Sequence, residues 1–288
     1  MILEHQLFQN ITPDSYDLVS IKKFIEQCGR ICYRSENLIT QDSYIDFYDK
    51  AIKSKHFSIL EHGTVYLTIK SCYLTAFELY LFYKDNKYSK VLLKGDDAFI
   101  TTNFRVIVEN NRYDDLRFMV AEPSHHERRR SVALRTSIQV YKELTRHRPA
   151  SFCIESTRYC NYTSNKFDNN IRVLIPFWFT TQHLYSDPIN DENIDSLKNA
   201  ITEEEFAYIK DQLDTEKAYN TISKKFGPQA AAGVLTQNTM ATVIITADVS
   251  TWNHIFALRV FNETGTAHPD TQAIMNEVYL NYTKRTLI

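Results

Sequence analysis

The sequence predicts an α+β fold in one domain over residues 1–288, with helices packed on a mixed or antiparallel sheet. Two observations indicate this class. Strand-like and helix-like stretches alternate without a regular strand–helix–strand repeat, and no Gly-rich phosphate loop of the dinucleotide-binding or P-loop type is present. The composition agrees, because 43% of the residues are hydrophobic and only 6 Gly and 7 Pro occur, which argues against long linkers.

In the first half of the chain, apolar residues at spacings of three and four predict helices over residues 16–30, 42–54 and 74–83. Residues 64–69 alternate between apolar and polar side chains, which is typical of a strand. The segment 99–108 is consistent with an extended piece or with a short helix, and both alternatives stay open.

In the second half, residues 131–138 alternate like a half-buried strand and precede a short helix at 140–144. Thr202 and Glu205 form a capping-box pattern that begins a long helix ending near Lys225. The β-branched or apolar segments 171–175 and 242–246 predict strands. Three further helices are expected: 229–235, one capped by Ser250 or Thr251 and reaching Arg259, and one from Pro269 to about Tyr282.

Charge and cysteine content exclude several classes of protein. The net charge of −2 provides no overall attraction to nucleic acid or to a membrane surface, so any anion site must be local. The run Arg128-Arg129-Arg130 is interpreted as a solvated edge, because no aromatic residues are interleaved with it. The five cysteines are odd in number and lack CxxC spacing, so neither a disulfide framework nor a metal site is expected. Cys28 and Cys32 are interpreted as small buried hydrophobes.

The N-terminal residues lack the basic and apolar regions of a secretory signal, and no apolar run is long enough to span a membrane. A cytoplasmic protein is therefore expected.

Three adjacent basic residues, Arg146-His147-Arg148, follow the predicted helix at 140–144. Successive helical side chains point about 100° apart, so these three suit a large polyanion such as a dinucleotide better than one small contact. The alternative is that they cap the carbonyl end of the helix and bind no ligand.

The longer pattern resembles the defining motif of the flavin-dependent thymidylate synthases: Arg-His-Arg, seven residues, Ser, and Arg two residues further on. Here these are Arg146-His147-Arg148, Ser156 and Arg158. Three other segments resemble the family in the same order along the chain. They are His56-x-Ser58-x-x-Glu61-His62, Phe256-Ala257-Leu258-Arg259 and Ala267-His268-Pro269. The flanking residues resemble a longer subgroup with an insertion, here roughly 69–130.

The resemblance implies methylation of dUMP at uracil C5, with FAD as cofactor, methylenetetrahydrofolate as carbon donor and NADPH as reductant. It also implies a homotetramer whose active sites combine several subunits, with no nucleic acid or membrane partner. The implied catalytic residues are Arg259, Arg158 and Ser156. Arg259 would stabilise negative charge on the uracil ring, and Ser156 would hydrogen-bond to dUMP, since the motif contains no base to activate it as a nucleophile.

The family positions also imply two sets of binding residues. The cofactor-binding residues are His56, Ser58, Glu61, Arg146, His147, Arg148, Ile154, Asp248, Ser250 and His254. The substrate-binding residues are Glu143, Arg146, Ile154, Glu155, Ser156, Thr157, Arg158 and Arg259.

Two positions depart from the family pattern. Ala232 stands where the family has an arginine that contacts dUMP, and Asp248-Val249-Ser250 replaces an Asn-x-Arg flavin contact. Lys224, Lys225 and Arg172 are candidates to replace the missing arginine. Two alternatives therefore stay open. One is a flavoenzyme of the same fold that acts on another pyrimidine nucleotide. The other is a non-catalytic nucleotide- or nucleic-acid-binding protein, which the net charge disfavours.

Overall fold

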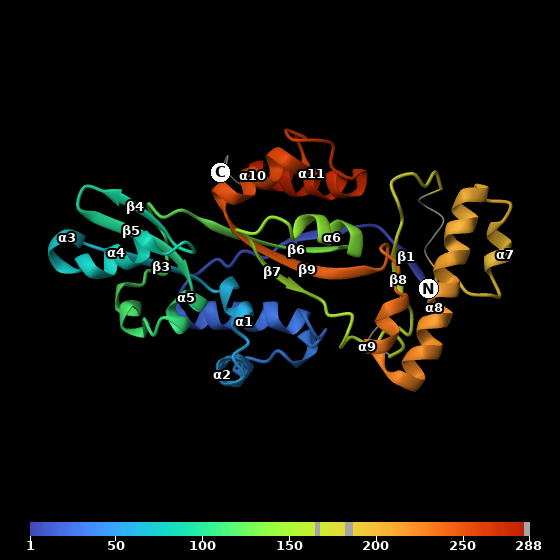
Figure 1. Cartoon of the computed structure of the whole chain (residues 1–288), viewed down its shortest axis with the longest axis horizontal. Helices are drawn as coiled ribbons and strands as arrows, with labels where there is room; N and C mark the ends of the chain where they lie inside the picture. Colours follow the sequence, from blue (N-terminus) through green and yellow to red (C-terminus); the bar gives the residue numbers. More distant parts are fainter. Residues whose placement is uncertain (165–167, 182–186, 285–288) are drawn as a thin grey trace.

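The computed structural model describes residues 1–164, 168–181 and 187–284. At its centre lies a four-stranded antiparallel sheet of order β2-β6-β9-β7 (Figure 1). The strands are β2 (Leu7–Asn10), β6 (Arg129–Ser137), β9 (Met240–Asp248) and β7 (Ser151–Ile154). β6 and β9 pair along their whole length, from Arg129 opposite Asp248 to Ser137 opposite Met240. This arrangement of sheet and helices confirms the α+β prediction.

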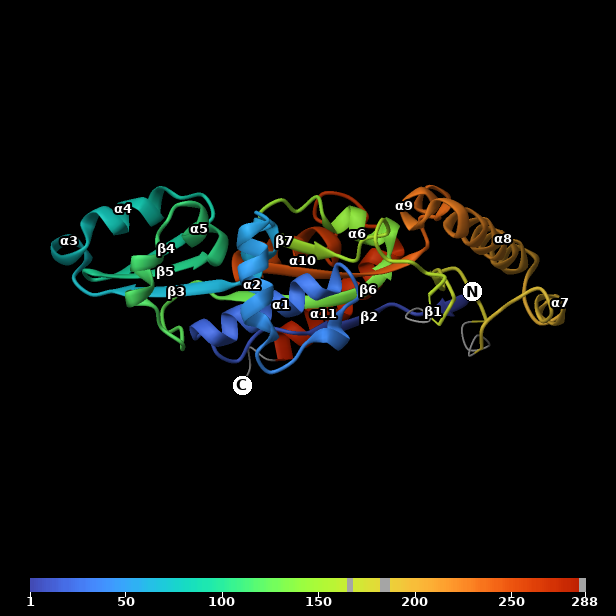
Figure 2. The same ribbon diagram turned by 90° about the horizontal axis from the view of Figure 1, so that it is seen from below.

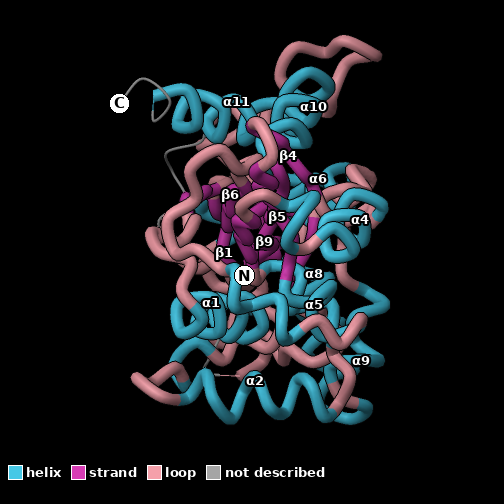
Figure 3. Tube along the Cα trace, turned by 90° about the vertical axis from the view of Figure 1, so that its left-hand side faces the viewer, coloured by secondary structure: helices cyan, strands magenta, loops and turns pink. Residues whose placement is uncertain are grey.

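Helices cover both faces of the central sheet. They are α1 (Leu18–Ile31), α2 (Ser43–Lys53), α6 (Ile138–Leu144), α10 (Val249–Arg259) and α11 (Pro269–Lys284). Side chains of a strand alternate between faces, and accordingly Val243 and Ile245 pack against α10 and α11 while Ile244 packs against Phe24 of α1. Figure 3 shows the resulting layers, with α10 and α11 on one side of the strands and α1 and α2 on the other.

A second, three-stranded antiparallel sheet of order β3-β5-β4 forms one end of the elongated molecule (Figure 2). Its elements are β3 (Thr64–Ile69), α3 (Cys72–Thr75), α4 (Phe77–Asp85), β4 (Lys90–Lys94), β5 (Asp97–Asn103) and α5 (Phe104–Glu109). Buried Tyr66 and Ile100 of this sheet belong to the same hydrophobic cluster as Ile21 of α1 and Tyr48 of α2. This cluster joins the end sheet to the helices beneath the central sheet.

The opposite end contains a short parallel pair and a long helix. Its elements are β1 (Ile2–Glu4), β8 (Arg172–Leu174), α7 (Ile194–Leu197), α8 (Glu203–Phe226), α9 (Pro228–Ala231) and the 3-10 turn Ala232–Val234. The expected capping box is present at the start of α8: the Thr202 hydroxyl accepts from the Glu205 amide at 3.2 Å, and the Glu205 carboxylate accepts from the Thr202 amide at 3.1 Å. Within the described ranges, no helix is both long and apolar enough to cross a membrane.

Several sequence-based expectations need correction. The helix expected at 74–83 is divided into α3 and α4, because Ala76 has φ −157° and leaves the helical region. The segment 99–108 contains both alternatives, since β5 ends at Asn103 and the Asn103 side chain caps α5. Helix α10 begins at Val249, so Asp248 rather than Ser250 or Thr251 occupies its N-cap position, and no side chain makes a capping hydrogen bond there. The strands β1, β2, β4 and β7 and the helix α7 had no predicted counterpart.

Two interpretations of single residues also fail. Arg129 is 7% exposed and lies inside the protein, so only part of the arginine run is a solvated edge. Cys28 is buried as expected, but Cys32 is only half-buried, and its sulfur lies 3.4 Å from that of Cys153.

Candidate active site

The Arg146-His147-Arg148 sequence lies in the turn between α6 and β7. Backbone hydrogen bonds from the His147 amide to the Leu144 carbonyl (3.1 Å) and from the Ala150 amide to the His147 carbonyl (3.0 Å) close this turn. Arg146 and Arg148 are exposed, while His147 is buried. The three side chains therefore diverge, as expected for successive residues at a helix end.

His147, Arg259 and Glu143 form a hydrogen-bonded network between α6 and α10. Arg259 Nη1 lies 2.5 Å from Glu143 Oε1, and Arg259 Nε donates to His147 Nε2 at 3.1 Å. The Thr271 hydroxyl of α11 donates to Glu143 Oε2 at 2.6 Å. Burial, together with the charge of Arg259, lowers the pKa of His147 to about 4. His147 is thus neutral near pH 7 and can accept the bond from Arg259, which fixes the guanidinium from two sides.

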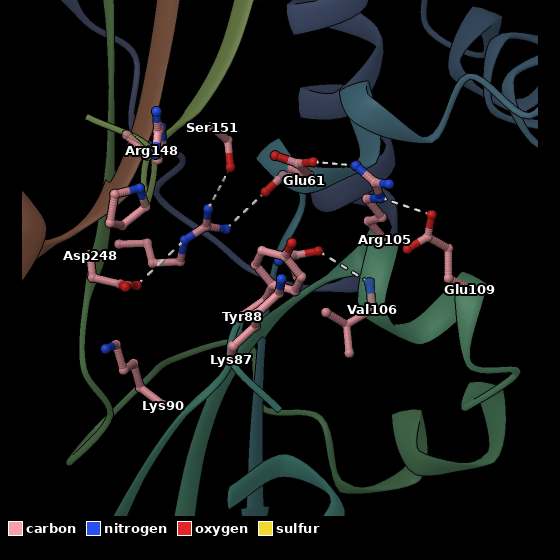
Figure 4. Close-up of a pocket in the computed structure, with 14 residues that line it drawn as sticks. Glu61, Lys87, Tyr88, Lys90, Arg105, Val106, Glu109, Arg148, Ser151 and Asp248 are labelled. Atoms are coloured by element: carbon pink, nitrogen blue, oxygen red, sulfur yellow. Dashed lines mark hydrogen bonds and ion pairs between the residues drawn. The ribbon is translucent and has the colours of Figure 1, made fainter. Parts of the chain in front are cut away.

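A pocket of about 440 Å³ lies between the three-stranded sheet and the turn before β7 (Figure 4). Three of the expected cofactor-binding residues line it: Glu61, Arg148 and Asp248. Arg105 of α5 pairs with Glu61 at 2.6 Å and with Glu109 at 2.9 Å. The ion pair between Arg105 and Glu61 fixes the Glu61 carboxylate beside α5.

Arg129 forms the floor of the same pocket. Its guanidinium donates to the Glu61 carbonyl at 2.9 Å, to Thr64 Oγ1 at 3.2 Å and to Ser151 Oγ at 3.3 Å. Its Nε lies 3.6 Å from Asp248 Oδ1. Burial raises the pKa of the Asp248 carboxyl, and the charges of Arg129 and then Lys90 oppose that rise. Arg129 thus ties η2 (Phe57–His62), β3, β7 and the end of β9 together.

The segment after β7 contains the expected nucleotide-binding residues. Glu155 is buried, and its carboxylate accepts from the Tyr162 hydroxyl at 3.1 Å and from the Thr242 amide at 3.3 Å. Burial raises the pKa of this carboxyl, while Arg34, 3.7 Å away, opposes the rise. The Glu155 side chain therefore points into the protein, so only its backbone remains for a ligand.

Ser156 and Arg158 are more accessible than Glu155. The Ser156 amide donates to the Cys32 carbonyl at 2.9 Å, and the Ser156 hydroxyl has no hydrogen-bond partner in the part of the chain that the structure describes. Arg158 is exposed, and its Nη2 donates to Gln229 Oε1 at 3.3 Å. Gln229 belongs to α9 and precedes Ala232 by three residues, so Arg158 contacts the helix that comes directly before the 3-10 turn with the missing arginine position. Arg172 is not available to replace that arginine, because it pairs with Glu4 and Asp168.

The structure therefore divides the expected site residues into three groups. One contains Glu143, His147 and Arg259; the second contains Glu61, Arg148 and Asp248; the third is the 154–158 segment. No hydrogen bond or ion pair between described residues joins one group to another. The other expected cofactor residues, His56, Ser58, Arg146, Ile154, Ser250 and His254, do not line the pocket, although the His254 ring lies 6.0 Å from that of His147. In the described ranges, no cluster of His, Cys, Asp and Glu could hold a metal ion.

Three residues that contact these groups were not predicted from the sequence: Arg129, Arg105 and Thr271. The burial of Arg129 could have been predicted, because the alternation of β6 places it on the same face as Ser131. The contacts of Arg105 and Thr271 could not, because they join segments far apart in the chain.

One family model matches the chain. Residues 129–285, more than half of the chain, match the family model described as "Thymidylate synthase complementing protein". No curated protein matches the chain. Among solved structures, two of the UMP/dUMP methylase PolB from Streptomyces cacaoi are similar. The form bound with 5-Br dUMP is 13% identical with a TM-score of 0.41, covering 99% of this chain and 93% of that one. The form bound with 5-Br UMP is 11% identical with a TM-score of 0.43, covering 99% and 92%.

Proposed function

The chain belongs to the thymidylate synthase complementing proteins, the flavin-dependent thymidylate synthases, and from this premise we propose that it methylates dUMP at C5 to dTMP. In the proposed reaction methylenetetrahydrofolate donates the carbon, NADPH is the reductant and FAD is the cofactor. The observation that carries the proposal is the family match over residues 129–285, which contains the Arg-His-Arg motif, Ser156, Arg158 and Arg259.

Arg259 is proposed to polarise the uracil ring. A cation held in a fixed direction stabilises negative charge that develops on the ring nitrogen and carbonyls, without reorganising during the reaction. Glu143 and neutral His147 supply that fixation, because they bond to different nitrogens of the guanidinium. Ser156 and Arg158 are proposed to bind dUMP. Since no base lies next to the Ser156 hydroxyl among the described residues, it suits a hydrogen bond better than nucleophilic attack.

FAD is proposed to bind at the pocket lined by Glu61, Arg148 and Asp248. The donor set fits a phosphorylated cofactor, because Arg148 is exposed and cationic beside buried, positively charged Arg129. The volume of about 440 Å³ falls in the usual range for ligand sites, so the pocket suits part of such a molecule. FAD would supply hydride transfer. The chain's residues would bind and orient it, with His56, Ser58, Arg146, Ile154, Ser250 and His254 as further proposed contacts.

A homotetramer with shared active sites is proposed as the assembly. The family resemblance supports this assembly, because it implies homotetramers whose active sites combine several subunits. Light scattering is expected to give four times the mass of 33.7 kDa.

A second candidate function is methylation of another pyrimidine nucleotide by the same chemistry. It is favoured by Ala232 and Ser250, which stand at two family arginine positions. Because the loss of one phosphate-directed guanidinium removes about 1.5–3 kcal/mol of binding, a compensating contact or a different substrate is required.

The test is to record the visible spectrum of the purified protein with FAD, to titrate dUMP, and then to assay methyl transfer to dUMP and dCMP. We expect a flavin spectrum that shifts on adding dUMP and methyl transfer to dUMP. Transfer to dCMP alone would support the second candidate. A protein that binds no flavin would contradict both functions.

A further inference from the structure

The segment interpreted as an insertion contributes seven of the 14 residues that line the pocket. Lys90 and Asn103 belong to the three-stranded sheet, Lys87 and Tyr88 to the turn before β4, and Arg105, Val106 and Glu109 to α5. Tyr88, Arg105 and Glu109 lie across the pocket from Arg148 and Asp248, whereas Lys90 lies near Asp248 (Figure 4). The insertion therefore forms one wall of the pocket as well as one end of the molecule.

The charges around the pocket are unbalanced in favour of cations. Five cationic side chains line it against three carboxylates. Each carboxylate lies within 4.0 Å of Arg105 or Arg129. Lys87, Lys90 and Arg148 form no ion pair with any residue that the structure describes. Five cationic and three anionic side chains leave the pocket lining with a net charge of +2, which favours a ligand with several negative charges, such as a pyrophosphate.

An exposed aromatic ring lies beside these lysines. Tyr88 is 64% exposed, and Lys87 Nζ lies 4.8 Å from its ring centroid. The turn that carries Tyr88 is held by hydrogen bonds, since the Asn86 side chain accepts from the Tyr88 amide at 2.9 Å and the Ser89 hydroxyl donates to Thr102 at 2.8 Å. An accessible ring on a turn held in this way, next to cationic side chains, is suited to stacking on a planar base.

We propose that Lys87, Tyr88 and Lys90 bind the adenine and pyrophosphate half of a dinucleotide cofactor in this pocket. The lysines contact the pyrophosphate from one wall and Arg148 from the other, and Tyr88 stacks on the adenine. Arg105 is a positioning residue that holds Glu61. The inference rests on the proposed function, in which FAD and NADPH are the two adenine dinucleotides.

The test compares Lys90→Ala, Tyr88→Leu and Tyr88→Phe with the wild type. Lys94→Ala is the matched control, because Lys94 is exposed on the same strand but lies outside the pocket. Dissociation constants for FAD, NADPH and riboflavin are measured by fluorescence. Lys90→Ala is expected to weaken dinucleotide binding about tenfold, the lower end for a hydrogen bond to a charged group, and to leave riboflavin, which has no phosphate, unchanged. Tyr88→Leu is expected to weaken it about fivefold, whereas Tyr88→Phe retains the ring and the affinity.

The outcomes distinguish FAD from NADPH as the occupant of the pocket. They also distinguish a failure of this proposal from a failure of the proposed function. Weaker binding of FAD supports the proposal with FAD as occupant, and weaker binding of NADPH alone supports it with the reductant as occupant. If both variants bind both dinucleotides as Lys94→Ala does, the proposal is overturned, while flavin binding by the wild type keeps the proposed function. Wild-type protein that binds neither dinucleotide overturns this proposal and the proposed function together.

Discussion

Replacing Arg129 by methionine tests whether the floor of the pocket depends on one buried guanidinium. The substitution keeps an apolar stem of similar length but removes three hydrogen bonds, to the Glu61 carbonyl, Thr64 and Ser151. It also removes the charge 3.6 Å from the Asp248 carboxylate. Because Asp248 is largely buried, it is left with an unpaired charge that burial already disfavours.

The expected loss of stability is about 3 kcal/mol. Removing one partner of a buried ion pair costs about 3–5 kcal/mol, and the 16% exposure of the Asp248 side chain places this pair at the lower end. Arg128→Met is the matched control, since Arg128 is exposed in the same run, and surface changes usually stay within about 0.5 kcal/mol. In the double variant Arg129→Met/Asp248→Asn no charge is left unpaired. Its loss is therefore expected to be about 1–2 kcal/mol smaller than the sum of the single losses.

The assay is urea denaturation followed by tryptophan fluorescence at one protein concentration, so that assembly contributes equally to each variant. The reasoning is refuted if Arg129→Met unfolds at the same urea concentration as Arg128→Met. It is also refuted if the two single losses simply add, because the charge pair would then contribute nothing.

Three further changes test other parts of the structure. Ala232→Arg is expected to tighten dUMP binding about tenfold by calorimetry, the lower end for a charged hydrogen bond at a half-exposed position; unchanged or weaker binding would mean a rebuilt pocket. His62→Gln should reduce acid sensitivity. Burial lowers the pKa of His62 to about 3, so the unfolded state takes up a proton first as the pH falls below about 6.5. His62 alone therefore contributes a fall in stability of about 2 kcal/mol between pH 7.5 and 5, in addition to the contribution of His147. The prediction is wrong if urea titrations give His62→Gln and the wild type the same pH dependence of the free energy of unfolding. Thr202→Ala should cost about 1 kcal/mol by removing the α8 cap, and an unchanged urea midpoint would show that the capping box is dispensable.

Helices and strands were predicted correctly where the sequence has a clear alternation over several residues or a distinct helix-start motif. Residues 64–69 form β3 with the predicted limits, and the capping box and Pro269 begin their helices as expected. The missed strands have three to five residues, which is too short for an alternation to be distinguished from chance. Strand β7 exists because it pairs with β9, which lies about ninety residues further along the chain.

The candidate site was predictable from spacing only in part. Family spacing selected all three residues and assigned Glu143 and Arg259 to dUMP and His147 to the cofactor, but it did not indicate that they bond to one another. Glu143 and Arg259 are 116 residues apart, and the sheet brings α6 and α10 together. The pocket wall of Lys87, Tyr88 and Lys90 belongs to no motif, so only the fold reveals its position opposite Arg148.

The turn after α6 separates the three side chains of Arg146-His147-Arg148. Arg148 lines the pocket proposed for FAD, whereas His147 bonds to Arg259. That bond requires a neutral ring, since a protonated imidazole has no free electron pair and would repel the guanidinium. With a pKa of about 4, His147 stays neutral throughout the neutral range. The direction of Arg259 is therefore independent of pH there, which supports its proposed role as a cation that polarises the uracil ring.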